Sequence, residues 1–122
     1  MVISVEKLQN DVYSLHFAKK VKLSFININL FKDKLNEIKS SNLKGLIINC
    51  KNLEFIDSSG ISVLVSFIKY ASKRGVWLKI CEVNEDMKKI FEMIKLGRLV
   101  EIADTEDEIL EKMEIVPIQV YY

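Results

Sequence analysis

One short apolar run constrains the fold of this chain more than any other feature. Residues 45–50 read Gly-Leu-Ile-Ile-Asn-Cys, without the alternation of apolar and polar side chains that marks a half-exposed strand. Such a run is expected of a strand covered on both faces in a parallel sheet. Residues 76–81 predict a second strand. The apolar helix expected between the two strands ends near Lys73-Arg74-Gly75, with basic residues in its last turn and a glycine beyond.

The remaining periodicity predicts alternating strands and helices along the chain. Residues 12–17 alternate with a period of two, which places Tyr13, Leu15 and Phe17 on one face and Ser14 and His16 on the other. The other predicted elements are an edge strand at 2–7, an amphipathic helix at 24–39, a helix from Asn84 to near Gly97, a strand at 99–103, and a short helix that a capping box at Thr105 opens. This order predicts an α/β fold with right-handed crossovers.

Length and composition suit one compact domain. The 122 residues are 49% hydrophobic and 29% charged, which is enough for one core. We expect this domain to span residues 1–113. Residues 114–122 form an apolar extension, which Pro117 restricts to an edge strand at most. The extension could cover a sheet edge, dock on a second copy of the chain in self-association, or fray.

Charge and segment patterns exclude several classes of function. A net charge of +1 argues against direct nucleic-acid binding. The cluster of Lys19, Lys20 and Lys22 is interpreted either as a patch that faces a partner or as a solvated strand end. The sequence shows no charged leader and no apolar run near the roughly 20 residues that span a bilayer, so we predict a cytoplasmic location without membrane insertion. The isolated Cys50 and Cys81 are expected to be buried thiols.

The stretch Phe55-Ile56-Asp57-Ser58-Ser59-Gly60-Ile61 places two hydroxyls at the start of the apolar helix. If Asp57 caps that helix, Ser58 and Ser59 occupy its first turn. Free backbone N–H groups and the positive end of the helix dipole favour an anion there. A serine in this position can cap the helix, act as a nucleophile, or accept a phosphate.

The faces of this helix differ in composition. At about 100° per residue, one stripe faces the core: Ile61, Leu64, Val65 and Ile68. Ser62 and Ser66 fall close to the face of Ser59, where small side chains leave room for another protein. A third line is interpreted either as the margin of the core or as a contact surface, and consists of Val63, Phe67 and Tyr70.

The residues give little support to catalysis. A nucleophilic serine needs a base within hydrogen-bond reach and an oxyanion hole. The only histidine, His16, is expected to be an ordinary strand residue. The sequence has neither a Gly-x-Ser-x-Gly elbow nor a Gly-x-x-x-x-Gly-Lys-Ser/Thr loop, and no cluster of metal ligands. We therefore predict no cofactor, metal or catalytic residue, and keep an α/β enzyme with an unusual site at Ser59 as a third hypothesis.

The motif at 55–61 resembles the STAS domain of bacterial anti-sigma factor antagonists. The strand at 46–49 precedes it, and Gly75, the strand to Cys81 and Leu96-Gly97 follow. The resemblance implies a mostly parallel sheet with an antiparallel edge strand and helices mainly stacked along one side. It implies a non-catalytic function, in which the unmodified domain binds an anti-sigma factor that is itself a serine kinase and so releases a sigma factor for transcription. Phosphorylation by that kinase switches the antagonist off.

The resemblance also assigns roles to individual residues. The phosphorylated position is the hydroxyl residue before the glycine, Ser59, and the switch motif is completed by Asp57, Ser58 and Gly60. Together with the open helix face described above, this places the partner-binding surface at Ser62, Val63, Ser66 and Lys22. A serine phosphatase is expected as a further partner.

One departure from the family concerns charge. Lys19-Lys20-Val21-Lys22 stands where such domains commonly carry a Gly-Glu-Leu-Asp-like turn, so the family's acid falls on Lys22. A lysine there could attract a phosphate or change the charge that the partner requires. The alternative interpretation of the chain is a constitutive STAS interaction module of a transporter or signalling assembly, in which the serines only cap the helix.

Overall fold

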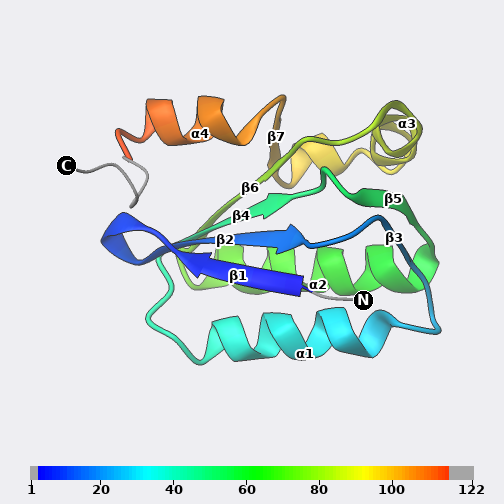
Figure 1. The fold of residues 1–122 in the computed structure, drawn as a ribbon, viewed down its shortest axis with the longest axis horizontal. Coiled ribbons are helices and arrows are strands. Elements are labelled where there is room, and N and C mark those ends of the chain that lie inside the picture. The colour runs from blue at the N-terminus through cyan, green and yellow to red at the C-terminus, as the bar shows by residue number, and fades with distance from the viewer. Residues whose placement is uncertain (1–2, 116–122) are drawn as a thin grey trace.

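The computed structural model describes residues 3–115, and its main sheet has five strands in the order β1-β2-β4-β6-β7 (Figure 1). These strands are β1 (Ile3–Lys7), β2 (Val12–Phe17), β4 (Gly45–Asn49), β6 (Trp77–Cys81) and β7 (Glu101–Ala103). β1 runs antiparallel to β2, whereas the other neighbouring pairs in this sheet are parallel. The mostly parallel sheet with an antiparallel edge strand is therefore confirmed.

The central strand β4 has the environment that its sequence predicts. All five of its residues are buried. Helices α1 (Ile28–Lys39) and α2 (Ser58–Lys73) lie on one face of the sheet, and α4 (Glu106–Lys112) lies on the other (Figure 1). Leu46 and Ile48 belong to the core shared with α1 and α2, whereas Ile47 packs in a second core with Ile109 of α4. Alternate side chains of β4 thus enter two cores, which explains why the run shows no polar alternation.

The remaining helices begin at the predicted caps. Asn84 precedes α3 (Glu85–Met93), and its Oδ1 accepts the N–H of Met87 at 2.8 Å. Thr105 precedes α4, and its Oγ1 accepts the N–H of Glu108 at 3.2 Å. α3 contributes to the same core as α1 and α2. The helices are therefore mainly stacked along one side, as predicted, and single 3₁₀ turns occur at Gln9–Asp11 and Leu96–Arg98.

The structure differs from the expectation in a second, two-stranded sheet. β3 (Val21–Leu23) runs parallel to β5 (Leu53–Ile56), and neither strand was predicted. At three and four residues, both strands are too short to show a period of two. This small sheet matters for function because β5 leads directly into α2 and β3 leads into the loop before α1.

Two predicted helix boundaries are wrong. α1 begins at Ile28 rather than Ser24, because the residues before it form a turn in which Asn27 Oδ1 accepts the N–H of Ser24 at 2.9 Å. α3 ends at Met93 rather than near Gly97, because Lys95 takes a left-handed conformation with φ of 57°. Both errors come from local turn geometry that interrupts an otherwise helical pattern.

Both cysteines are buried free thiols, as predicted. Burial raises the pKa of Cys50 to about 12, so this thiol stays protonated and unreactive at neutral pH. Cys50 lies in the core shared with α1 and α2, whereas Cys81 lies in the core beneath α4.

Most of the predicted extension at 114–122 lies outside the described residues. Ile115 is buried in the core beneath α4. The role of the extension stays a prediction. Within residues 3–115, no helix combines the length and apolar character needed to cross a bilayer.

Candidate functional site

Asp57 caps α2, as predicted. It follows β5 with an extended backbone, and its Oδ1 accepts the N–H of Gly60 at 3.1 Å. Its own N–H donates to the carbonyl of Leu23 in β3 at 2.9 Å. The small sheet therefore sets the position at which α2 begins.

The second carboxylate oxygen of Asp57 reaches the loop before α1. Its Oδ2 accepts the N–H of Phe25 at 3.1 Å. One side chain thus joins the start of α2 to the β3–α1 loop. Ser58, the first residue of the helix, is exposed, and Ser59 is partly exposed. Because the cap is the aspartate, the serines lie in the first turn, where backbone N–H groups favour an anion.

Gly60 lets α2 approach the small sheet closely. A Cβ at this position would lie 2.5 Å from Cγ1 of Ile56 and 3.4 Å from Cβ of Leu23, and both of these side chains are buried. The glycine of the motif is therefore explained by packing.

We expect Gly60→Ala to lower the free energy of unfolding by about 1–2 kcal/mol, because overpacking outweighs the better helix propensity of alanine. The matched control is Gly97→Ala, where an added Cβ meets nothing within 4 Å. Equilibrium urea unfolding measures both variants. If Gly60→Ala were as stable as the wild type, the close approach at Ile56 would be contradicted.

Three of the four residues predicted to bind the partner lie along a groove between α1 and α2, whereas Lys22 does not. Ser62 and Ser66 are exposed and Val63 is partly buried, and all three line this groove. Of the line formed by Val63, Phe67 and Tyr70, Phe67 is 2% exposed and belongs to the core. Their role in binding stays a prediction.

Lys22 is an exposed residue of β3 and pairs with Phe55 of β5. Its carbonyl accepts a hydrogen bond from Asn27 Nδ2 at 2.9 Å. Lys22 thus precedes the loop that Asp57 holds.

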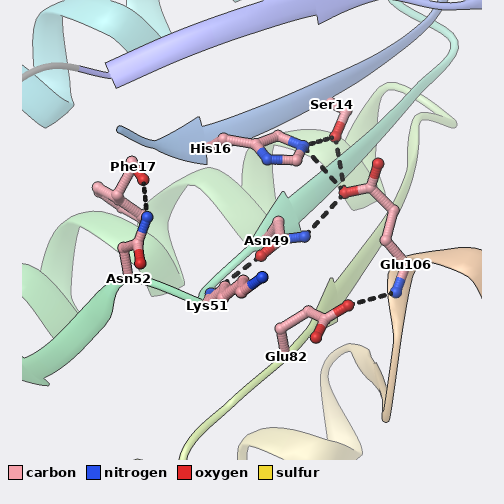
Figure 2. Close-up of polar contacts among 8 residues, drawn as sticks. All are labelled: Ser14, His16, Phe17, Asn49, Lys51, Asn52, Glu82 and Glu106. Carbon is pink, nitrogen blue, oxygen red and sulfur yellow. Dashed lines mark hydrogen bonds and ion pairs between the residues drawn. The ribbon is translucent and has the colours of Figure 1, made fainter. Parts of the chain in front are cut away.

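A second polar cluster lies on the side of the sheet that α4 covers (Figure 2). Oε1 of Glu106 lies 3.0 Å from Ser14 Oγ, 3.0 Å from Asn49 Nδ2 and 3.0 Å from His16 Nε2. Ser14 Oγ is also 2.8 Å from His16 Nε2. A single carboxylate oxygen therefore links β2, β4 and α4.

The cluster holds an ion pair. Its hydrogen bond to Glu106 raises the pKa of His16; partial burial opposes this, and the charges of Glu106, Glu6 and Glu82 add to it. Burial raises the pKa of Glu106, but hydrogen bonds from His16, Asn49 and Ser14 lower it by more, so the net shift is downward. Both shifts favour protonated His16 beside ionised Glu106.

This arrangement does not activate a nucleophile. A catalytic serine must pass its proton to the histidine, whereas Ser14 donates to Glu106 and is fully buried. His16 also faces the α4 side of the sheet, whereas Ser59 lies in the first turn of α2, which covers the other side. The hypothesis of an enzyme site at Ser59 is therefore abandoned. Among the described residues, no group of three or more His, Cys, Asp or Glu side chains could hold a metal ion.

The prediction that His16 is an ordinary strand residue was incomplete. The sequence partly indicated a polar cluster on this face of the sheet. The alternation of β2 places Ser14 and His16 on one face, and Asn49 is the one polar side chain in β4. The acid that joins them, Glu106, is 92 positions from Ser14 in the sequence. Glu106 lies in the predicted capping box that starts at Thr105, and this local role already explained an acidic residue there. The sequence therefore offered no reason to expect a distant partner.

Comparison with known proteins identifies the family. The sequence profile of the STAS domain matches residues 4–109. The chain therefore belongs to the STAS domain family, whose anti-sigma factor antagonists are not catalytic.

Individual relatives extend this result. An anti-sigma F factor antagonist from Paenibacillus polymyxa is 31% identical over 71 residues, which cover 58% of this chain and 61% of that protein. The crystal structure of TM1081, a candidate anti-sigma factor antagonist from Thermotoga maritima, is 25% identical, with a TM-score of 0.78 over 92% of this chain and 94% of that one.

The fold is also that of SpoIIAA, an anti-sigma factor antagonist. The unphosphorylated form is 17% identical with a TM-score of 0.71, over 93% of this chain and 98% of that one. The phosphorylated Bacillus form is 18% identical with a TM-score of 0.70, over 92% of this chain and 99% of that one. By distant homology, the chain is a STAS protein like the anti-sigma factor antagonists.

Proposed function

We propose that this chain is an anti-sigma factor antagonist that acts in the cytoplasm. It binds an anti-sigma factor serine kinase when Ser59 is unmodified and releases it when Ser59 is phosphorylated, which regulates sigma-factor-dependent transcription. A serine phosphatase restores the binding form. The observation that carries the proposal is the partly exposed Ser59 in the first turn of α2, within a STAS domain.

The start of α2 suits a switch that leaves the fold in place. Asp57 holds the first turn through Oδ1 and the β3–α1 loop through Oδ2, and neither hydrogen bond involves Ser59. A phosphate adds about 1.5 to 2 negative charges at pH 7. The N-terminal end of a helix stabilises such charges. Phosphorylation would then alter the binding surface without unfolding the helix.

The direct test incubates the purified chain and ATP with each anti-sigma factor kinase that its own genome encodes. Intact mass spectrometry should show one added phosphoryl group on the wild type and on Ser58→Ala, but none on Ser59→Ala. A phosphate that persists on Ser59→Ala would place the site elsewhere. A wild type that binds a kinase without being phosphorylated would instead favour the constitutive interaction module.

A further inference from the structure

The two segments that meet at the start of α2 carry lysines but no acid. Residues 18–32 include Lys19, Lys20, Lys22 and Lys32 but no acidic residue, and residues 58–68 have no charged side chain. All four lysines are exposed, and none of them forms an ion pair within the described part of the chain. The acids between the two segments in the sequence are Asp33, Glu37, Glu54 and Asp57. Of these, Glu37 is paired with Lys34, and Asp57 is engaged in hydrogen bonds to backbone N–H groups. The two segments themselves therefore carry four lysines and no acid, in a chain whose net charge is only +1.

The groove between α1 and α2 continues this surface. Its volume is about 190 Å³, and its charged lining residues are Lys32 and Lys39. On the α2 side it is lined by Ser62, which lies one helical turn beyond Ser59, and by Ser66. An acidic side chain that entered the groove would meet two cations and two hydroxyls.

The β3–α1 loop adds an apolar element beside the serines. Phe25 is 74% exposed and Ile26 is 82% exposed. Large apolar side chains that protrude together from a polar surface mark interaction sites.

Hydrogen bonds hold this loop in one conformation. The N–H of Phe25 donates to Asp57 at 3.1 Å, and the side chain of Asn27 bonds to Ser24 N–H and to Lys22 carbonyl, both at 2.9 Å. A fixed loop loses little conformational entropy when its exposed side chains bind.

We infer that the contact surface of the partner is acidic and contains an apolar pocket that receives Phe25 and Ile26. The inference rests on the proposed function and adds the chemistry of the anti-sigma factor. Buried aromatic anchors supply most of the affinity of an interface, whereas charge complementarity supplies association rate and specificity. It also gives a reason for the switch, because a phosphate on Ser59 would place negative charge where an acidic partner binds.

The test measures the affinity of the anti-sigma factor kinases from the same genome for charge-reversal variants by surface plasmon resonance. Lys22→Glu and Lys32→Glu should each weaken binding roughly tenfold, mainly through slower association, and the wild type should bind more weakly as salt rises. The matched control is Lys89→Glu, an exposed lysine of α3 without an ion pair among the described residues. Equal affinities for Lys22→Glu, Lys32→Glu and Lys89→Glu would overturn the inference while leaving the proposed function intact.

A separate pair of variants tests the exposed apolar side chains of the β3–α1 loop. Phe25→Ser should weaken binding about tenfold or more, whereas Met93→Ser, at an 81% exposed residue of α3, should not. If the wild-type chain bound none of the kinases, both the proposed function and this inference would be contradicted. Phe25-dependent sedimentation with phosphatidylglycerol vesicles, and not with phosphatidylcholine vesicles, would identify a membrane surface and overturn the protein partner.

Discussion

Replacing Ser59 with aspartate should weaken binding of the anti-sigma factor at least a hundredfold and leave the thermal midpoint nearly unchanged. The loss corresponds to about 3 kcal/mol of binding free energy. It arises because a partner surface that fits a neutral hydroxyl would instead meet a larger, charged group, whose desolvation is costly. The fold tolerates the same anion, because a carboxylate in the first turn of a helix is stabilised by about 0.3–1 kcal/mol.

Two variants separate charge from shape in this prediction. Ser59→Asn has nearly the size of aspartate but no charge, so its affinity should stay within severalfold of the wild type. Ser58→Asp places the same charge on the exposed neighbouring residue and should weaken binding less. Titration calorimetry with the kinase and thermal unfolding of each variant give the two readouts. Loss of cooperative unfolding in Ser59→Asp would show that the serine is structural rather than a switch.

The start of α2 could be predicted from the sequence because its determinants are local. Asp57, Ser59 and Gly60 lie within one helical turn, and the cap, the first-turn hydroxyl and the small residue each follow from spacing alone. The buried strand β4 was equally accessible, because coverage on both faces leaves a continuous apolar run. The sequence offers no catalytic base near the motif and no phosphate-binding loop, which argued against catalytic interpretations of the serines.

The features that were missed depend on contacts between distant segments. β3 and β5 are short strands that stabilise each other across some thirty residues of chain, so neither shows a pattern by itself. The reach of Asp57 to Phe25 and the link from Glu106 to β2 are likewise invisible in local spacing. The β3–β5 pair and the loop before α1 are the parts of the candidate site that only the structure supplies.

We expect the Glu106 carboxylate to make a large polar contribution to stability, because one of its oxygens contacts Ser14, His16 and Asn49. Glu106→Leu would leave Asn49 Nδ2, in a residue 6% exposed, without its acceptor, and would leave Ser14, 0% exposed, with His16 as its remaining side-chain partner. Unsatisfied buried groups cost about 1–3 kcal/mol each, so the variant should lose roughly 2–4 kcal/mol of unfolding free energy. Glu106→Gln keeps a carbonyl acceptor and should lose less. Asp107→Asn removes a charge from the same helix turn and controls for the helix dipole.

The pH dependence of Glu106→Gln relative to the wild type tests the ion pair itself. The raised pKa of His16 means that its contribution is complete below the ordinary pKa of 6.5 and is lost as the pH rises through the raised value. The lowered pKa of Glu106 means that its contribution is complete above the ordinary 4.5 and is lost as the pH falls through the lowered value. The stability difference between wild type and Glu106→Gln should therefore be greatest between pH 4.5 and 6.5 and shrink on both sides. Urea unfolding measured inside this window and on both sides of it tests the prediction, and a difference that does not shrink at either end would mean that His16 and Glu106 are not paired as charges.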